Sequence, residues 1–260
     1  MRARVSLFLL LVLLLIIPAA VPSAHGDGAG TSDPPRRADR FIGELRRFLG
    51  APYQLGPLGE GPHDPIDPKP LLDLTRFDCV TLLETALART LDAPQDSLAA
   101  TLARIRYRDG RIAFLARNHF FVPDWIPANS WLVEDVTADI GRERTRSLTR
   151  TIGRQKFLRA KGLSFPEYAD EPEYTTDVIP AAAFPEAAAR IREPLIIVFV
   201  GEVDWLFALH TGAVYRDAGG RLMLIHASAK RGVVAEEDLL AYLKGTGRYL
   251  GVKLLAIRDG

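Results

Sequence analysis

Phe77-Asp78-Cys79-Val80-Thr81 is the stretch that decides the fold, and it contains the only cysteine in the chain. A loop rich in glycine and proline precedes it, and apolar residues recur every three or four positions from Val80 onward, which predicts a helix with a buried face. Cys79 is therefore expected in the first turn of that helix, with Asp78 as the N-cap. Because unpaired N–H groups and the helix dipole favour an anion there, the position predicts a lowered thiol pKa and a nucleophilic role.

The composition describes a globular chain with no bias toward a polyanionic partner. Of its 260 residues, 48% are hydrophobic and 25% charged, and 33 basic against 32 acidic side chains give a net charge of +1. This balance provides no electrostatic case for nucleic-acid binding. We expect a single domain over residues 39–260, with an insertion around residues 130–192, that acts as a monomer.

The N-terminal segment is typical of export. Met1 to Arg4 are positively charged overall, and an unbroken apolar run follows up to Pro18. This predicts a signal peptide over residues 1–26, followed by a disordered leader over residues 27–38, and hence a periplasmic or extracellular protein without membrane attachment after cleavage. The alternative is a retained anchor helix, although the run is short for a span of about 20 residues. A lone cysteine in an exported chain is either a free reactive thiol or an inert buried one.

Helices are predicted in the first half and an antiparallel sheet in the second, which makes the fold class α+β. Besides the helix at Cys79, helical periodicity covers residues 40–49 and 97–106. The basic residues 140–165 indicate a solvated face, with attraction to an anionic polymer such as the cell wall as the alternative. Residues 166–194 are interpreted as a proline-bearing surface excursion with a short helix at 181–189. Strands are then expected at 195–200, 206–215, 222–227, 233–234 and 252–257, with a helix at 236–244.

Two histidines lie on neighbouring strands of this predicted sheet. Asp217 to Gly220 form the expected hairpin turn between the strands of His210 and His226. A loop of three or five residues centred on Ala218 would pair the two histidines directly, whereas a two-residue turn would put them on opposite faces. An activated thiol needs a base that a third group orients, so we assign His210 as base and general acid and His226 as its orienting partner. The alternative is a pair of structural strand histidines.

An aromatic-rich loop over residues 118–126 supplies candidates for substrate recognition. His119, Asp124 and Trp125 are expected in a pocket wall, with core packing as the alternative. A zinc site built from His119, Asp124, His210 and His226 would offer a different route to amide cleavage, but no close metal-ligand spacing is present. We therefore predict neither a metal nor another cofactor.

These residues resemble the NlpC-type papain-like cysteine peptidases and amidases of the bacterial cell wall. The resemblance rests on the segment Gly50 to Gly56, on Phe77-Asp78-Cys79, and on His210 followed by His226. A narrower resemblance, to an N-acetylmuramoyl-L-alanine amidase-like branch, covers nearly the whole mature chain. It is carried in order by Phe77 to Thr81, Ile105 to Gly110, His119 to Phe121 with Asp124 to Ile126, His210 to Gly212, and His226 to Ser228.

The resemblance implies a papain-like fold, with N-terminal helices and the nucleophile at a helix start packed on a C-terminal antiparallel sheet or half-barrel. It implies hydrolysis of the N-acetylmuramoyl-L-alanine amide bond of peptidoglycan or muropeptides by a Cys-His-His mechanism. Tyr53 is then expected near the oxyanion or substrate backbone, and Asp78 near the substrate. Val80-Thr81 after the cysteine replaces the small residue usual in the wider superfamily, and no wall-binding repeats are present. The alternatives are a D,L-endopeptidase that cuts the γ-D-Glu to diamino-acid bond and a non-catalytic wall-binding module.

Overall fold

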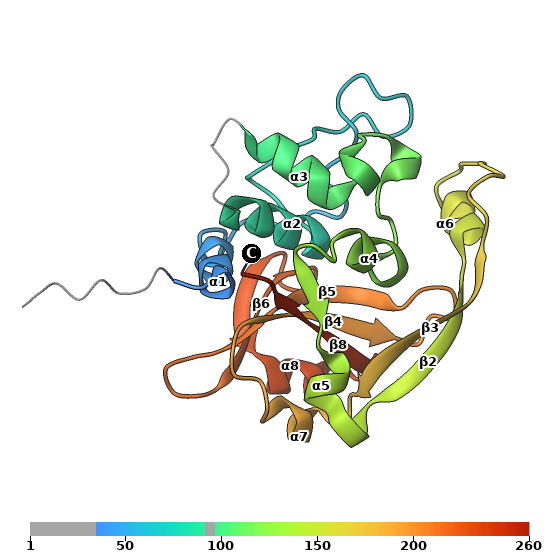
Figure 1. The fold of residues 1–260 in the computed structure, drawn as a ribbon. Helices are drawn as coiled ribbons and strands as arrows, with labels where there is room; N and C mark the ends of the chain where they lie inside the picture. The colour runs from blue at the N-terminus through green and yellow to red at the C-terminus, as the bar shows by residue number, and fades with distance from the viewer. Residues whose placement is uncertain (1–34, 92–96, 260) are drawn as a thin grey trace, which may run out of the picture. The chain divides into compact units, whose positions relative to one another are not determined.

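The computed structural model describes residues 35–91 and 97–259 (Figure 1). The predicted signal peptide and all of the predicted leader before residue 35 lie outside these residues. The end assigned to that leader is wrong, because helix α1 (Arg37–Arg46) already begins at Arg37 and buries Ala38. Within the described ranges, no helix is both long enough and apolar enough to span a membrane.

The helices of the first half pack on one side of the sheet (Figure 1). These are α1, α2 (Cys79–Thr90), α3 (Leu98–Arg106) and the single turn α4 (Ile126–Ala128). The predicted start of a helix at Cys79 and the helix over 97–106 are confirmed. The helix expected over 40–49 instead ends at Arg46, where the N–H groups of Arg47 and Phe48 donate to carbonyls three residues back and tighten the chain into turns.

Eight strands form one antiparallel sheet in the order β2-β3-β8-β4-β5-β6-β7, with β1 paired to β8. Their bounds are β1 (Val133–Asp135), β2 (Arg146–Ile152), β3 (Glu171–Pro180), β4 (Leu195–Gly201), β5 (Ala208–Arg216), β6 (Leu222–Ser228), β7 (Val233–Asp238) and β8 (Tyr249–Ile257). The predicted meander β4-β5-β6-β7 and the α+β class are confirmed. The last strand does not close an edge, however, because β8 returns between β3 and β4.

Alternation along β4 separates two hydrophobic cores. Ile196 and Val198 face the helices α1 to α3, while Ile197 and Phe199 face the opposite layer. That layer contains α5 (Thr137–Gly141), α7 (Phe184–Ala188) and α8 (Leu239–Thr246). Because β4 is covered on both faces, it is buried along its whole length and appears in the sequence as a continuous apolar run.

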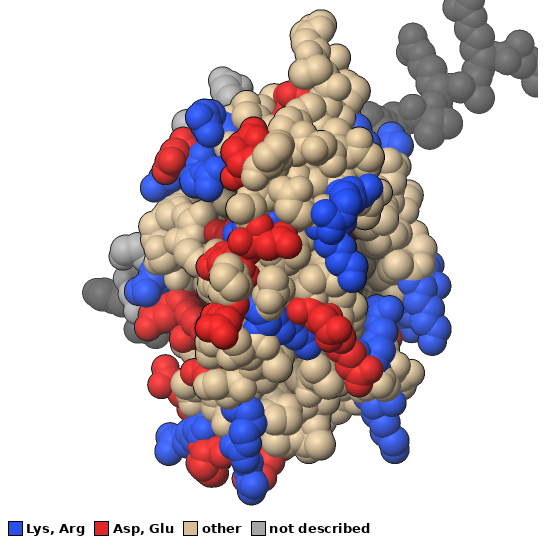
Figure 2. Space-filling model, turned by 90° about the vertical axis from the view of Figure 1, so that its right-hand side faces the viewer, with Lys and Arg blue, Asp and Glu red and all other residues tan. Residues whose placement is uncertain are grey.

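Residues 146–180 form an arm that extends the sheet, built from β2, α6 (Arg154–Ala160) and β3. Neither strand of the arm was predicted. The exposed side chains of β2 agree with the predicted solvated face, and β3 lies inside the segment predicted as a surface excursion. The less exposed side of β2 carries Leu148, Arg150 and Ile152, and Arg150, which donates to backbone carbonyls, interrupts the apolar alternation that marks a half-buried strand. Basic and acidic side chains are interspersed on the face that carries the arm (Figure 2), so this face gives no support to attraction of an anionic polymer.

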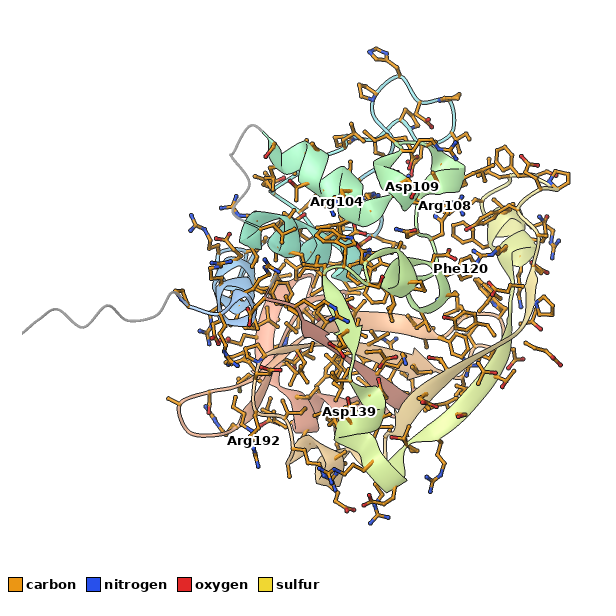
Figure 3. The ribbon with its side chains drawn as sticks, in the orientation of Figure 1. Arg104, Arg108, Asp109, Phe120, Asp139 and Arg192 are labelled. Carbon is orange, nitrogen blue, oxygen red and sulfur yellow. The ribbon has the colours of Figure 1, made fainter. Side chains whose placement is uncertain are left out.

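Short turns of other helical types complete the described elements. They are η2 (Arg108–Gly110), η3 (Phe114–Ala116), the π-helical turn η4 (Phe121–Trp125) and η5 (Arg142–Arg144). Asp109, beside Arg108 at the end of α3 (Figure 3), has a positive φ of 56°. Asp is one of the few residues that tolerate this conformation, so the turn predicted at 107–111 is present.

Candidate active site

Cys79 is the first residue of α2, and Asp78 caps the helix as predicted. The Oδ1 atom of Asp78 accepts hydrogen bonds from the N–H groups of Val80 (3.1 Å) and Thr81 (2.8 Å), and the Thr81 hydroxyl accepts from the N–H of Asp78 (3.0 Å). This reciprocal pattern is a capping box. Because the cap uses the next two N–H groups, the N–H of Cys79 itself is the helix-start donor left for an oxyanion.

Asp78 also fixes the loop that carries Tyr53. Its Oδ2 atom accepts a hydrogen bond from the N–H of Gly56 (2.9 Å), and Tyr53 forms a bridge with Phe77. Both carboxylate oxygens are thus engaged and the residue is 9% exposed, so the expectation that Asp78 contacts substrate is corrected to a structural role. Burial raises the pKa of Tyr53, with a smaller contribution from charge at Cys79, and both residues line the same pocket.

The hairpin brings the two histidines together, although not in the predicted register. β5 and β6 pair as Tyr215↔Met223 and Arg216↔Leu222, so the five-residue loop is centred on Gly219 rather than Ala218. Since the loop is odd in length, His210 and His226 share a face, but as diagonal neighbours rather than a direct pair. The Nε2 atom of His210 lies 2.6 Å from the Nδ1 atom of His226.

Gly212 makes this diagonal contact possible. A Cβ atom at position 212 would lie 2.8 Å from the carbonyl oxygen of Ile225 and 3.1 Å from the Cβ atom of His226. A side chain there would push the His226 ring or the backbone of β6 aside.

Glu237 extends the pair into a chain of three groups, and sequence reasoning missed it. Its Oε1 atom lies 2.8 Å from the Nε2 atom of His226. A carboxylate only accepts, so His226 donates from Nε2 and accepts at Nδ1, and His210 must then donate from Nε2. The Nδ1 atom of His210 is left as its basic nitrogen.

A signal for Glu237 was present in the sequence. The predicted strand stopped at Val234, whereas β7 continues to Asp238 and pairs Ala235 with His226. Alternation then places Glu237, two residues after Ala235, on the face of His226. The helix expected over 236–244 correspondingly begins later, at Leu239.

The protonation states differ from those expected at a helix start. Burial raises the pKa of Cys79 to about 12, and the negative charge of Asp78 adds to this, while hydrogen bonds from the backbone of Thr211, Cys79 and Val80 act in the opposite direction. The predicted lowering of the thiol pKa is therefore wrong. Burial lowers the pKa of His210 to about 3 and also lowers that of His226. At neutral pH the thiol and both imidazoles are thus uncharged.

Two pockets meet at Cys79. The larger, of about 820 Å³, extends toward α8 and the β6–β7 turn, and the smaller, of about 200 Å³, extends toward the aromatic loop. Cys79, Leu209 and His210 line both. No hydrogen bond joins Cys79 to His210 within the described residues, but both side chains border the same space, and Cys79 keeps partial solvent exposure.

The three residues predicted for substrate recognition divide between the site and its surroundings. His119 lines the smaller pocket, with its Nε2 atom 2.8 Å from the carbonyl oxygen of Phe114. Trp125 is fully buried, so its assignment to the pocket wall is wrong. Asp124 does line a pocket, but a separate one of about 460 Å³ that it shares with its ion-pair partner Arg154 at 2.6 Å and that Cys79 does not border. Phe120, which follows His119 in sequence and is labelled in Figure 3, borders the smaller pocket.

The ligands of the zinc alternative do not gather at one point. Asp124 is bound to Arg154, and His119 is hydrogen-bonded to a backbone carbonyl. Over residues 35–91 and 97–259, no three His, Cys, Asp or Glu side chains are grouped so that they could hold a metal ion.

A second buried polar cluster lies further along α2. Glu84 is 2% exposed, accepts a hydrogen bond from the indole N–H of Trp125 at 3.1 Å and faces Arg106 at 3.7 Å. Burial raises the pKa of Glu84 to about 7, although the charge of Arg106 opposes this. Trp125 therefore anchors the aromatic loop to the middle of α2.

Comparisons with known proteins identify a family and a fold. The family model described as AmiA-like, N-acetylmuramoyl-L-alanine amidase-like, matches residues 45–248. A Legionella pneumophila protein of the family DUF1460 has a TM-score of 0.74 at 24% identity, over 86% of this chain and 89% of that one. An N-acetylmuramoyl-L-alanine amidase from Bacteroides uniformis has a TM-score of 0.69 at 22% identity, over 85% and 99%.

A Bacteroides fragilis protein with a provisional xylanase name has a TM-score of 0.68 at 26% identity, over 82% of this chain and 99% of that one. No match was found among curated proteins. At these identities, the solved structures support the fold.

Proposed function

Because this chain belongs to the AmiA-like family of N-acetylmuramoyl-L-alanine amidase-like proteins, we propose that it hydrolyses the amide between the lactyl group of N-acetylmuramic acid and L-alanine. The observation that carries the mechanism is the chain His210, His226 and Glu237 beside a lone cysteine at a helix start. We include in the proposal a Cys-His-His mechanism of the papain-like, NlpC-type kind, acting on peptidoglycan or muropeptides.

Acylation begins from uncharged groups. Burial keeps the Cys79 thiol protonated and His210 neutral, so proton transfer to His210 Nδ1 accompanies attack of the sulfur on the lactyl carbonyl. The C–S bond forms as the carbonyl becomes an oxyanion, which the N–H of Cys79 and the Tyr53 hydroxyl stabilise. The resulting imidazolium of His210 is stabilised through His226 by the carboxylate of Glu237.

Collapse of the oxyanion breaks the C–N bond, and His210 gives its proton to the leaving nitrogen of L-alanine. The muramyl group remains as a thioester on Cys79. Water, deprotonated by His210, then attacks the thioester and releases the lactyl carboxylate and the free thiol. Throughout, His226 and Glu237 act as positioning residues, because they hold the His210 ring and its tautomer while His210 alone exchanges the proton.

The predicted signal peptide supports an activity outside the cytoplasm. We propose export to the periplasm or the extracellular space, where intact peptidoglycan and soluble muropeptides are both accessible. We also propose that the protein acts as a monomer.

Mass spectrometry of products from a defined muropeptide tests the function. We expect a free muramic acid carboxylate and a peptide that begins with L-alanine. A peptide that begins with the diamino acid would instead establish the D,L-endopeptidase. Xylan incubated in parallel should release no sugar.

Cys79→Ala should reduce the rate by at least about 10⁴-fold, as removal of other catalytic nucleophiles does. Because the chain has a single cysteine, a thiol reagent acts at this position alone and provides an independent check. Activity that survives both treatments would refute the cysteine mechanism. Sacculus binding without product release by the unmodified protein would indicate the wall-binding module.

A further inference from the structure

The two pockets that meet at Cys79 differ in charge. The smaller is lined by aromatic and aliphatic side chains, among them Phe120, Phe157, Trp205 and Phe207, and contains no Asp, Glu, Lys or Arg. The larger is lined by Lys230, Arg231 and Arg248 together with Glu237 and Asp238. We call them the aromatic pocket and the basic pocket.

The two acidic residues of the basic pocket already have hydrogen-bond partners within the protein. Glu237 bonds His226 and lies 3.8 Å from Arg231, and Asp238 caps α8 by accepting from the N–H of Ala241 at 2.8 Å. Lys230, in contrast, is exposed at the β6–β7 turn and has no ion-pair partner among the residues that the structure describes. The charge in this pocket that has no ion-pair partner among the described residues is therefore positive.

One residue that lines the aromatic pocket has a buried hydroxyl without a partner among the described residues. No hydrogen bond is made by the hydroxyl of Thr211 within this part of the chain. Thr211 follows His210 directly and lines this pocket. Apolar walls with one unsatisfied hydroxyl suit an uncharged ligand that presents both C–H faces and hydrogen-bonding groups, as an N-acetylated sugar ring does.

Resting on the proposed function, we infer that the site orients its substrate by charge: the aromatic pocket binds the muramyl sugar and the basic pocket binds the anionic stem peptide. The two halves of the substrate differ in the same way as the pockets, since the sugar half is uncharged and the stem peptide carries carboxylates. Transfer of a carboxylate into the aromatic pocket would desolvate it without a counter-charge. The scissile amide lies where the pockets join, at Cys79.

Two substrate pairs test the orientation. The tripeptide carries either a free or an amidated α-carboxyl group on D-Glu, and each of these two forms bears either the full muramyl group or only a D-lactyl group, which gives four compounds. Lys230→Met should lower kcat/KM about twofold to fivefold for the free carboxyl substrate and leave the amidated one unchanged. Lys244→Met, on the exposed face of α8 and outside the pocket, is the charge-matched control and should change neither.

Trp205→Leu should lower kcat/KM about fivefold to tenfold for the muramyl substrate and leave the lactyl substrate unchanged. Trp131→Leu, which lines neither pocket, is the matched control, and Phe157→Leu replaces Trp205→Leu if that variant does not fold. Calorimetric binding of the same four compounds to Cys79→Ala gives a readout that needs no turnover.

Different results would refute the proposed function and the proposed orientation of the substrate. Cleavage of a different bond by the unmodified protein would refute the proposed function, and the binding differences would still report the orientation. If Lys230→Met instead weakens recognition of the sugar, or Trp205→Leu abolishes discrimination between the free and amidated carboxyl groups, the orientation is wrong. Equal effects of both variants on all four compounds would overturn it as well.

Discussion

The two halves of helix α2 hold buried polar groups in contrasting ways. At its start, Cys79 borders two pockets and shares them with His210, the proposed proton acceptor, which His226 holds in place. In its middle, Glu84 is enclosed, held by Trp125 and faced by Arg106. Both groups have raised pKa values because the surrounding protein desolvates them, although Cys79 keeps partial solvent exposure and Glu84 is fully buried. The difference shows that burial alone does not make a group reactive: access to substrate and a proton acceptor distinguish the two.

The largest expected effect is on stability and comes from the middle of the helix. Glu84→Ala leaves the guanidinium of Arg106 buried without a counter-charge, so we expect a loss of about 3–5 kcal/mol in the free energy of unfolding, measured by urea denaturation. Glu84→Leu combined with Arg106→Met removes both charges and should recover most of this loss. A cost below about 1 kcal/mol for Glu84→Ala would show that the pair is not isolated from water.

The reactivity of Cys79 gives the second prediction. Because burial and Asp78 raise its pKa to about 12, little thiolate is present at pH 7.5, and iodoacetamide should react on the order of 100-fold more slowly than with a free thiol. The rate is measured by mass spectrometry, with urea-unfolded protein as the reference. A native rate equal to the unfolded rate would mean that the sulfur is ionised or freely solvated.

The third prediction concerns the histidine chain. In Glu237→Gln the side-chain amide can donate to His226 and reverse the tautomers of both rings, so kcat/KM should fall about tenfold or more, with a changed pH profile. Glu236→Gln is the neighbouring control, since Glu236 bonds Tyr215 instead and should retain nearly full activity. Equal losses of kcat/KM in the two variants would show that Glu237 has only a general structural role.

The smallest effect is a change in the pH dependence of stability. His210 has a folded pKa near 3, below its ordinary 6.5, so the unfolded chain binds more protons between these values and stability rises with pH there. Glu84 has a folded pKa near 7, above its ordinary 4.5, so its contribution falls as pH rises from about 4.5 to 7. Glu84→Gln removes the contribution of Glu84, which is opposite in sign to that of His210. Tm should therefore rise more steeply with pH between pH 4.5 and 6.5 in this variant. An unchanged slope would contradict the shift at Glu84.

The sequence predicts those parts of the molecule in which local signals and burial agree. The cap at Asp78, the periodicity of α2 and the apolar run of β4 are strong local patterns, and each element is found where it is expected. The exposed strand β2 has no such pattern. Its pairing with β3 depends on contacts that are distant in sequence, and no local signal reports them.

The site divides in the same way. Cys79, His210, His226 and Tyr53 are recognisable from the chemistry of their motifs and lie around one space. The register around Gly219 depends on the exact loop length, which moves the pairing by two residues. The direction of the Cys79 pKa depends on how deeply the folded chain encloses the sulfur. Glu237 emerges only when the length of β7 is known.

The carboxylate of Asp78 has a mechanical consequence. One oxygen holds the first turn of α2 and the other holds the N–H of Gly56, three residues after Tyr53. The loop that carries Tyr53 and the helix that begins at Cys79 are thus joined through one carboxylate, which restricts their movement relative to each other. His210 belongs to the β5–β6 hairpin, outside this connection, so its distance from Cys79 is set by the packing of α2 on β5 rather than by the loop.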